Sequence, residues 1–570
     1  MVNLEKQKKR VLVLCALPYT NGIPHIGNIV GSHLPADIFA RFCRLKGYET
    51  LFIGGTDENG APTEIVAREL KISPKKLTDI LHEIHKQIYE WLYISYDYFS
   101  RTSSLTHHKV TQEFFKKLYR REYISKKNLI MPYCEKDKLF LPDRYVEGKC
   151  PYCGYEHAHG DQCEKCTKLL DPDKLIDPKC KICGNKPVFK ETKHLFFKLN
   201  KLEKKIEKWI ESNRKWREHV RSLSLAWIKE GLKERCITRD LEWGVKVPLK
   251  GYENKVFYCW FDAPIGYLSF TIEWVEKNRR PQEWKSYWQD KNAFIVNWMG
   301  KDNIPFHTIF WPGMLIAHGD LNLPSYVAGL QYCNYEGSKI SKSRGWGIFC
   351  EKLPMTEIDV DIWRFYFTFL IPETSDTNFR WEEFKNKVNN ELIGNIGNFI
   401  YRTLSFIWKY FDGTIESGKL KKEDKKLIKK IVHSIRIVEK NLESFELRKG
   451  LIEILNISSM GNKYFQENKP WELIKVDKER CKTIIWICAY ICKVLAILMS
   501  PYLPKTAERI KNQLNLTELK WKDLQDLNFK KKHKINSPEI LFEKLTEEKI
   551  EKLKNIVTKP TPLEEFLQER

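Results

Sequence analysis

The sequence predicts an α/β domain that is interrupted by a cysteine-rich insertion and followed by an all-α helix bundle. Three observations support this fold class. Apolar runs of strand length alternate with helical patterns over residues 1–118 and return over 246–338, which is typical of a parallel sheet with crossover helices. Seven of the sixteen cysteines lie between Cys134 and Cys183. From Asn386 to about residue 550, apolar residues recur at helical spacing with few strand signals, which favours a helix bundle.

The first predicted strand is the apolar run from Val11 to Leu17, followed by a turn rich in Pro, Asn and Gly and by a helix that starts near Ile29. Strand-like runs over 255–260 and 294–296 are expected to complete the sheet. Residues 551–570 contain Pro560 and Pro562, so we expect this segment to trail from the bundle as a tail.

Composition limits the classes of protein that remain. A chain of 570 residues is longer than one ordinary domain, and its hydrophobic fraction of 42% is enough for packed cores. No apolar stretch reaches the roughly 18–20 residues that span a bilayer, and the charged N-terminus is not followed by a signal-peptide pattern. We therefore expect a soluble, cytoplasmic protein with no membrane partner.

The net charge of +23 suits a polyanionic partner such as RNA, because neutralised phosphates release counterions. A lysine-rich composition also produces solvated helix faces, as residues 421–426 illustrate. Charge alone therefore does not identify a partner.

Two CxxC pairs predict a zinc site. Cys150 and Cys153 are separated from Cys163 and Cys166 by nine residues, and two such turns that converge supply four thiolates at tetrahedral geometry. Disulfides are disfavoured in a chain without a secretion signal. The remaining alternative is a set of free thiols.

A second zinc site is possible on the same segment. Cys180 and Cys183 form another CxxC, while Cys134 and Asp137 occupy the place of a partner pair in which a carboxylate replaces one thiolate. Carboxylate oxygen is a known zinc ligand. The alternative is a vestigial knuckle that packing holds in place, and the sequence leaves the choice open.

Two short motifs predict the halves of one ATP site. Residues 24–28, Pro-His-Ile-Gly-Asn, lie between a strand and a helix, where a helix N-terminus favours phosphate. His25 and Asn28 are hydrogen-bond donors there, and Gly27 leaves room for the nucleotide. Residues 339–343, Lys-Ile-Ser-Lys-Ser, place two ammonium groups on a loop that is suited to close over pyrophosphate.

These motifs resemble the HIGH and KMSKS signatures of class I aminoacyl-tRNA synthetases. Five further blocks narrow the resemblance, over about the whole chain, to the methionyl-tRNA synthetase family: 16–22 (ALPYTNG), 54–60 (GGTDENG), 141–145 (LPDRY), 260–267 (WFDAPIGY) and 300–307 (GKDNIPFH). One departure is visible, because Asn28 stands where HIGH has its last histidine. The archaeal and eukaryotic members share this form.

The resemblance implies a domain order. It consists of a Rossmann-like catalytic domain in two halves (1–118 and 246–338), a connective insertion with the zinc knuckle or knuckles (119–245), the KISKS loop with a stem-contact segment (339–385), a helical anticodon-binding domain (386–550) and a C-terminal tail (551–570).

The resemblance also implies the function of a methionine–tRNA ligase. ATP with Mg²⁺ would activate methionine, and the methionyl group would pass to tRNA(Met), including initiator tRNA. One structural Zn²⁺, or two, would complete the cofactors. A monomer is expected. Some relatives carry a further oligonucleotide-binding domain at the C-terminus that we do not find here, which leaves a separate tRNA-binding protein as a candidate partner.

Individual roles follow from the matching positions. The catalytic residues would be His25, Asn28, Lys339 and Lys342, and ATP binding would add Gly27, Gly300 and Asp302. The methionine site would comprise Leu17, Tyr19, Asp57, Trp260, Ala263, Pro264, Tyr267, His307 and Trp311. The anticodon would be read by Asn398, Arg402 and Trp471.

Simpler interpretations exist for many of these residues. Lys339 could be a surface lysine, His25 a core histidine, Asp57 a helix N-cap, and the aromatic residues ordinary core. Two other functions are the alternatives: a class I synthetase for another apolar amino acid and a non-catalytic tRNA-binding paralogue. The short insertion argues against an editing enzyme, and the intact motifs argue against the paralogue.

Overall fold

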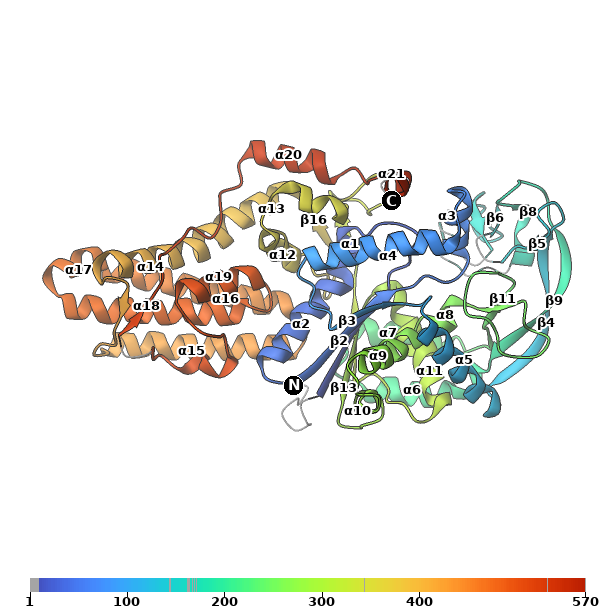
Figure 1. Cartoon of the computed structure of the whole chain (residues 1–570), viewed down its shortest axis with the longest axis horizontal. Coiled ribbons are helices and arrows are strands. Elements are labelled where there is room, and N and C mark those ends of the chain that lie inside the picture. Colours follow the sequence, from blue (N-terminus) through green and yellow to red (C-terminus); the bar gives the residue numbers. More distant parts are fainter. Residues whose placement is uncertain are drawn as a thin grey trace.

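The computed structural model describes residues 10–142, 145–160, 163, 165–166, 168, 170, 172–342, 344–529 and 532–568. Asp143 and Arg144 of the 141–145 block and Ser343 of the KISKS loop lie outside the described residues. The molecule is elongated, with the helix bundle at one end, the insertion at the other and a parallel sheet between them (Figure 1).

The central sheet has five parallel strands in the order β14-β13-β1-β2-β3. Its strands are β1 (Arg10–Cys15), β2 (Glu49–Thr56), β3 (Tyr98–Arg101), β13 (Phe294–Gly300) and β14 (Tyr326–Leu330). The chain order reverses between β1 and β13, because β2 and β3 extend the sheet on one side and β14 on the other. Such a reversal leaves a crevice at the carboxyl ends of the strands, where open α/β sheets bind ligands.

Helices flank this sheet on both faces, and their apolar sides supply the core. They are α2 (Leu34–Leu45), α4 (Pro74–Trp91), α5 (Leu105–Arg120), α9 (Ile265–Lys277) and α11 (Trp311–His318). The expected helix near Ile29 begins earlier, with α1 (Ile26–Asn28), and continues through the π-helix η1 (Ile29–His33) into α2. Both predicted strands at 11–17 and 294–296 are present as β1 and β13.

The prediction that residues 255–260 form a strand of the main sheet was wrong. Only β12 (Val256–Phe257) is extended, and it pairs with β11 (Thr238–Arg239) in a separate two-stranded sheet. The chain then turns into the short helix α8 (Cys259–Asp262). The run of apolar and aromatic residues reflects burial beside the cavity described below, and periodicity alone does not distinguish that from a buried strand.

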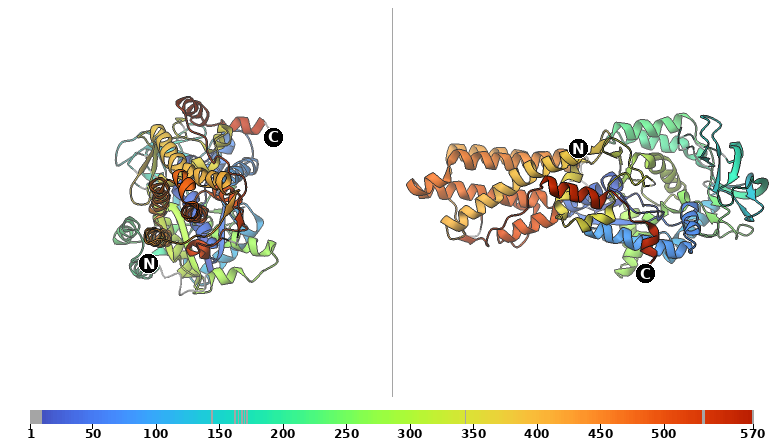
Figure 2. Two further views of the ribbon diagram at one scale, coloured as in Figure 1. Left: turned by 90° about the vertical axis from the view of Figure 1, so that its left-hand side faces the viewer. Right: turned by 90° about the horizontal axis from the view of Figure 1, so that it is seen from above.

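The insertion contains two antiparallel sheets and forms the right-hand end of the molecule in the right view of Figure 2. A four-stranded sheet contains the long strands β4 (Ile124–Cys134) and β9 (Val188–Phe197), with β5 (Leu139–Phe140) and β10 (Arg235–Cys236) at its edges. The cysteine pairs extend from a three-stranded sheet of β6 (Val146–Lys149), β7 (Ala158–His159) and β8 (Ile176–Cys180). Helices α6 (Glu203–Ser212) and α7 (Glu218–Lys229) return to pack against α11 and β14, respectively.

The segment that the sequence analysis names the stem-contact segment leads to the bundle. It contains β15 (Cys333–Tyr335), β16 (Thr377–Phe379), the 3-10 segment η7 (Cys350–Thr356), α12 (Val360–Phe369) and α13 (Trp381–Lys387). The bundle comprises the π-helix η8 (Val388–Gly397), α14 (Asn398–Tyr410), α15 (Lys422–Glu443), α16 (Leu447–Asn468), α17 (Pro470–Val476), α18 (Lys478–Met499) and α19 (Pro504–Gln513). Helical spacing therefore predicted this half correctly.

Helix α18 corrects the statement that no apolar stretch is long enough to span a bilayer. Its 22 residues reach that length and hydropathy, and 94% of the apolar window is buried inside the protein. Two lysines, Lys482 and Lys493, interrupt the run in the sequence and hid its length. The burial is that of a helix in a packed core.

The described residues 551–568 do not trail from the bundle, contrary to the expectation from the sequence. Helix α20 (Glu547–Val557) packs against η7 and leads to helix α21 (Leu563–Gln568), both at the top of Figure 1. The N–H of Phe349 donates to the carbonyl of Val557 at 3.0 Å, and the N–H of Thr561 donates to Glu351 at 3.0 Å. The buried stripe of Ile550, Leu553 and Val557 explains this docking, and the two prolines concealed that signal.

Candidate functional site

A cavity of about 360 Å³ opens at the switch point of the sheet. Its walls come from the segment after β1, the end of β2, the segment after β13, helices α8 and α9, and the KISKS loop. All seven predicted ATP-binding residues line it: His25, Gly27, Asn28, Gly300, Asp302, Lys339 and Lys342. The two motifs that lie far apart in the sequence therefore meet in one cavity.

Backbone pairing brings these motifs together. The N–H of Ile26 donates to the carbonyl of Ile348 at 3.1 Å, and the N–H of Cys350 donates to the carbonyl of Pro24 at 3.0 Å. His25 and Phe349 form an isolated antiparallel bridge between these two bonds. Since residues 348–350 follow the KISKS loop directly, the pairing fixes the base of that loop against the 24–28 turn.

The 24–28 turn is built around its histidine. The N–H of His25 donates to Asn28 Oδ1 at 3.0 Å, as in a capping box. A Cβ at Gly27 would lie 2.9 Å from the His25 ring, so only glycine lets the imidazole occupy this position. His25 Nδ1 is buried without a protein partner among the described residues. Burial, with Lys342 nearby, lowers the pKa of His25 to about 3 and keeps the ring neutral.

The two lysines of the KISKS loop differ in environment. Lys342 extends over Gly22, where an added Cβ would be 3.3 Å from its Nζ. Its side chain is exposed to solvent in the cavity. Desolvation by the surrounding protein nevertheless lowers the pKa of Lys342 to about 8. Lys339 is exposed at the cavity edge, with its ammonium 5.3 Å from the centroid of the Tyr332 ring. The Lys342 ammonium is desolvated and forms no ion pair with a carboxylate among the described residues, so it is well placed to interact with phosphate.

Asp57 provides a carboxylate in the wall of the cavity. It is 3% exposed, and Oδ1 has no hydrogen-bond partner among the described residues. Burial, together with the carboxylate of Asp262, raises its pKa well above the usual range. Its backbone is fixed by bonds of Asp57 N–H to the Pro18 carbonyl at 2.8 Å and of Thr20 N–H to the Asp57 carbonyl at 3.0 Å. A buried, unpaired carboxylate of this kind favours a cationic ligand group.

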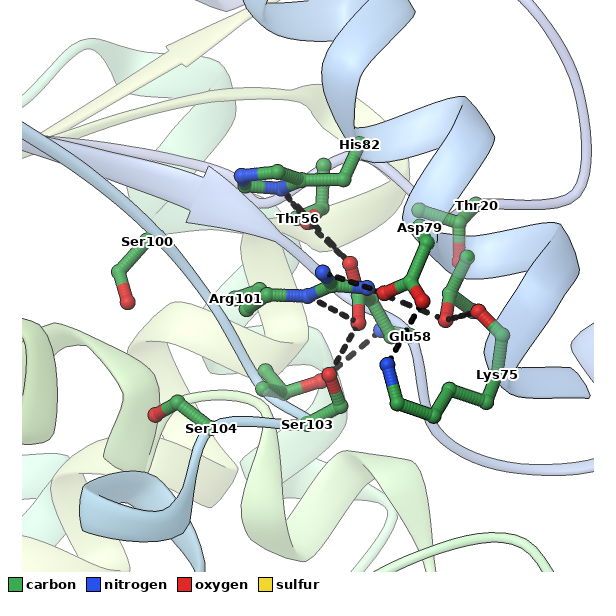
Figure 3. Close-up of polar contacts among 12 residues, drawn as sticks. Thr20, Thr56, Glu58, Lys75, Asp79, His82, Ser100, Arg101, Ser103 and Ser104 are labelled. Carbon is green, nitrogen blue, oxygen red and sulfur yellow. Dashed lines mark hydrogen bonds and ion pairs between the residues drawn. The ribbon is translucent and has the colours of Figure 1, made fainter. Parts of the chain in front are cut away.

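A polar network next to Asp57 holds this part of the chain (Figure 3). The carboxylate of Glu58 accepts hydrogen bonds from Arg101 Nε at 2.8 Å and Ser103 Oγ at 2.5 Å. Arg101 also contacts Asp79 at 2.7 Å, and Figure 3 shows the dashed lines from Arg101 to both carboxylates. The network ties β2 to β3 and α4, and the position of Asp57 is therefore held from outside the cavity.

Apolar and aromatic side chains line the cavity together with Asp57. Six of the residues that the sequence analysis assigns to methionine binding are among them: Leu17, Tyr19, Trp260, Ala263, Tyr267 and His307. Two other predicted residues do not line the cavity. Trp311 is fully buried behind Tyr267, with ring centroids 6.4 Å apart, and Pro264 is the N-cap of α9.

The hydrogen bonds of His307 fix its tautomer. Its Nδ1 lies 2.8 Å from the carbonyl of Asn303 and must donate, so Nε2 accepts from the Tyr267 hydroxyl at 2.8 Å. Burial lowers the pKa of His307 to about 4, so the ring is neutral. The pair presents an uncharged wall suited to an apolar side chain.

Sequence reasoning missed several cavity residues: His33, His85, Gln331 and Tyr332. Gln331 and Tyr332 follow the carboxyl end of β14, so the rule that identified Asp302 after β13 would have found them had β14 been recognised. His85 lies on α4 and donates from Nε2 to the carbonyl of Gly22 at 3.0 Å. We find no sequence signal that separates it from an ordinary buried histidine.

The three predicted anticodon residues lie in the bundle, away from the cavity. Asn398 and Arg402 share one face of α14, and Trp471 follows Pro470 at the start of α17, as predicted. The guanidinium of Arg402 lies 4.7 Å from the Phe465 ring centroid, which is 6.1 Å from that of Trp471. Asn398 is exposed and Trp471 half-buried, so neither is a core residue.

The cysteine pairs form two clusters, each with four ligand atoms within 4.8 Å of one another: Cys150, Cys153, Cys163 and Cys166, and Cys134, Asp137, Cys180 and Cys183. In the first, Sγ–Sγ distances of 3.8 Å (Cys150–Cys166) and 3.6 Å (Cys153–Cys163) exclude disulfides, whose sulfurs are about 2.05 Å apart. They fit a zinc tetrahedron, because Zn–S bonds of about 2.3 Å give edges of about 3.8 Å.

Both clusters contain the same knuckle turn. Gly154 N–H donates to the Cys150 carbonyl at 3.0 Å, and Gly184 N–H donates to the Cys180 carbonyl at 2.8 Å. Each glycine has a positive φ, 71° and 75°, which a residue with a side chain rarely adopts. In the second cluster, Asp137 Oδ2 lies 3.0 Å from Cys134 Sγ and 3.2 Å from Cys180 Sγ. This repeated turn favours a second metal site over a vestigial one.

Comparison with known proteins agrees with this arrangement. The family model for class I tRNA synthetases (M) matches residues 11–404, and that for the anticodon-binding domain of methionyl-tRNA ligase matches residues 415–558. The methionine–tRNA ligases of Pyrococcus furiosus and Methanopyrus kandleri are each 43% identical, over 95% and 96% of this chain and 76% and 82% of their own lengths.

The fold also matches a solved structure. Mycobacterium tuberculosis methionyl-tRNA synthetase in complex with methionyl-adenylate superposes with a TM-score of 0.78 at 23% identity, covering 94% of this chain and 99% of that chain. The family matches and the two converging signature motifs define a class I aminoacyl-tRNA synthetase. Within that class, the chain belongs to the methionine–tRNA ligase family.

Proposed function

We propose that the chain activates methionine with ATP and transfers the methionyl group to the 3′-terminal ribose of tRNA(Met), including initiator tRNA, for protein synthesis. The carrying observation is the set of groups that line one cavity. Side chains of both motifs line it together with aromatic residues and with Asp57, a buried carboxylate that has one oxygen without a partner among the described residues. This set of groups suits ATP and an amino acid bound in one site.

The first step needs alignment rather than a protein nucleophile. A carboxylate oxygen of methionine attacks the α-phosphorus of ATP, a new P–O bond forms, and the bond to the bridging oxygen of pyrophosphate breaks. His25 and Asn28 would donate to phosphate oxygens, while Lys339 and Lys342 would stabilise the charge that develops on the departing pyrophosphate. Mg²⁺ would accompany the triphosphate.

The ends of the substrate pair would be held by the two carboxylates of the cavity. Asp57 would pair with the methionine ammonium, which supplies the cation that its buried position lacks. Asp302 would accept hydrogen bonds from the ribose hydroxyls, with Gly300 allowing close approach. Leu17, Tyr19, Trp260, Ala263, Tyr267 and His307 would enclose the thioether, and Pro264 and Trp311 would support that wall from behind. Sulfur–aromatic contacts contribute about 0.3–1.5 kcal/mol each.

The second step would use the bundle and the insertion. The terminal ribose hydroxyl of tRNA attacks the carbonyl carbon of the adenylate, and AMP leaves. Asn398, Arg402 and Trp471 would read the CAU anticodon by hydrogen bonding and stacking. Zinc held by the two cysteine clusters would supply structural rigidity to the insertion, and no reaction step is assigned to it.

We retain the predicted domain bounds as part of this proposal, with the described residues 551–568 of the last segment docked rather than trailing. We also propose that the protein acts as a monomer in the cytoplasm, with a separate tRNA-binding protein as a candidate partner.

Pyrophosphate exchange with each of the twenty amino acids tests the proposed function. We expect exchange that depends on methionine and Mg²⁺. If leucine, isoleucine or cysteine supported exchange as well as methionine does, the chain would be a synthetase for another amino acid. If no amino acid supported exchange while tRNA still bound, the non-catalytic alternative would hold.

A further inference from the structure

Tyr332 lies between the two proposed halves of the ATP site. It follows the carboxyl end of β14, lines the cavity and is half-buried. Its hydroxyl donates a short hydrogen bond to Asp302 Oδ1. Two ammonium groups approach its ring, Lys301 Nζ at 3.8 Å and Lys339 Nζ at 5.3 Å from the centroid. One side chain therefore contacts both the proposed ribose acceptor and the first lysine of the KISKS loop.

The backbone of Tyr332 is held in place from the stem-contact region. Its N–H donates to Asp376 Oδ1 at 2.9 Å, and its carbonyl accepts from Thr377 N–H at 2.9 Å. Asp376 also pairs with Lys301 at 3.2 Å, which fixes the cation on the Tyr332 ring. These bonds make the ring a rigid surface rather than a mobile side chain at the cavity edge.

The Tyr332 ring holds the Lys339 ammonium near the cavity. Among the residues that the structure describes, no carboxylate forms an ion pair with Lys339, and its side chain is exposed. An ammonium over an aromatic ring within about 6 Å gains a cation–π attraction that is modest at an exposed site. Such a weak attachment suits a lysine that must be near the triphosphate but free to follow it.

The hydroxyl of Tyr332 is a permanent donor. Partial burial and the carboxylate of Asp302 raise its pKa, so the phenol stays protonated at neutral pH. A carboxylate oxygen accepts more than one hydrogen bond, because it has two lone pairs. The Tyr332 hydroxyl therefore orients Asp302 while leaving it able to accept from a ribose.

We propose that Tyr332 is a positioning residue of the ATP site: its hydroxyl orients Asp302 for the ribose, and its ring holds Lys339 beside the triphosphate. This inference rests on the proposed function. The two roles belong to different atoms of one side chain, so substitutions separate them.

Two variants make that separation, measured by pyrophosphate exchange and single-turnover adenylate formation. Tyr332→Phe removes the hydroxyl and keeps the ring. We expect the KM for ATP to rise about three- to tenfold, as for one lost hydrogen bond, with the rate at saturating ATP retained. Tyr332→Leu removes both groups, and we expect an additional two- to fivefold loss in the saturated rate, on the order of one exposed cation–π contact.

A double-mutant cycle identifies the partner of the ring. Lys339→Ala should lower the rate by the same factor in the wild type and in Tyr332→Phe, and by a smaller factor in Tyr332→Leu. The KM for methionine and the melting temperature of Tyr332→Phe should match the wild type, which distinguishes positioning from a folding defect.

Specific outcomes would overturn the proposal. A lower KM for ATP in Tyr332→Phe would mean that the hydroxyl competes with the ribose. Equal saturated rates in the Phe and Leu variants, or equal Lys339→Ala effects in both, would remove the role of the ring. The proposed function is judged separately, because methionine-dependent exchange by the wild type does not depend on any of these variants.

Discussion

The cavity and the proposed anticodon-reading face of the bundle differ in how firmly their side chains are held. In the cavity, Asp57 is fixed by backbone bonds on both sides, and His307 is fixed by bonds at both ring nitrogens. On the bundle, Arg402 donates a hydrogen bond to the exposed Gln466 at 3.3 Å and contacts the Phe465 ring. Asn398 is exposed.

This difference follows from what each region must bind. In the proposed function, small charged substrates react in the cavity, and fixed dipoles and charges contribute most when they need no reorganisation. Single-stranded bases are unstacked as they bind, so the side chains that meet them can be ordered at that moment. We therefore expect amino-acid substitutions in the cavity to affect the chemical step. Substitutions on the bundle should affect tRNA binding alone.

Lys342→Ala should give the largest effect. Removing this ammonium should slow adenylate formation by about 10²–10³, with little change in methionine affinity, because the interaction is made mainly in the transition state. Single-turnover kinetics without tRNA measure this directly. Lys352→Ala, on the nearby segment η7, is the matched control and should behave as the wild type. An unchanged rate of adenylate formation in Lys342→Ala would contradict the expectation that substitutions in the cavity affect the chemical step.

Trp471→Ala should separate the two regions most clearly. A base-stacking surface is worth about 1–3 kcal/mol, so aminoacylation of tRNA with a CAU anticodon should fall by roughly ten- to more than a hundredfold. Pyrophosphate exchange without tRNA should stay near the wild type, because that step does not use the anticodon.

The control for Trp471 is Trp521→Ala. Trp521 is also half-buried, but it packs on Phe42 of the α/β half, with ring centroids 5.2 Å apart. Both variants should lose some thermal stability, and only Trp471→Ala should lose aminoacylation selectively. Parallel losses of exchange, aminoacylation and melting temperature in Trp471→Ala would make it a structural residue.

The features of this molecule that could be predicted from sequence are those with a local sequence pattern. The 24–28 and KISKS motifs, the cysteine spacings and the helical periodicity after Asn386 all have local signatures. Tyr332 follows β14, a strand that the sequence analysis did not identify. His33 and His85 lie on the helical segments η1 and α4, where no local pattern separates them from ordinary buried histidines. The docking of α20 was likewise hidden, since it depends on a distant surface next to Phe349.

The pH dependence of ATP use should reflect Lys342. Its pKa is lowered to about 8, so the free enzyme loses this charge as the pH rises through that value. The kcat/KM for ATP reports the free enzyme and should fall about tenfold per pH unit above that pKa. Lys342→Arg should flatten this limb, because a guanidinium remains charged. A limb that persists unchanged in Lys342→Arg would assign it to another group.

The smallest expected change is in metal content, where the two cysteine clusters offer an internal comparison. Both have the same glycine turn, so we expect two zinc ions per chain and one in Asp137→Ala, whose carboxylate faces Cys134 and Cys180. Glu135→Ala, beside it but outside the cluster, should keep two. Because these clusters lie in the insertion, methionine-dependent exchange should change little in Asp137→Ala.

Metal analysis by mass spectrometry determines the number of zinc ions per chain. Two ions in Asp137→Ala would clear Asp137 of an essential ligand role, one ion in the wild type would leave the second knuckle without metal, and none would refute both sites.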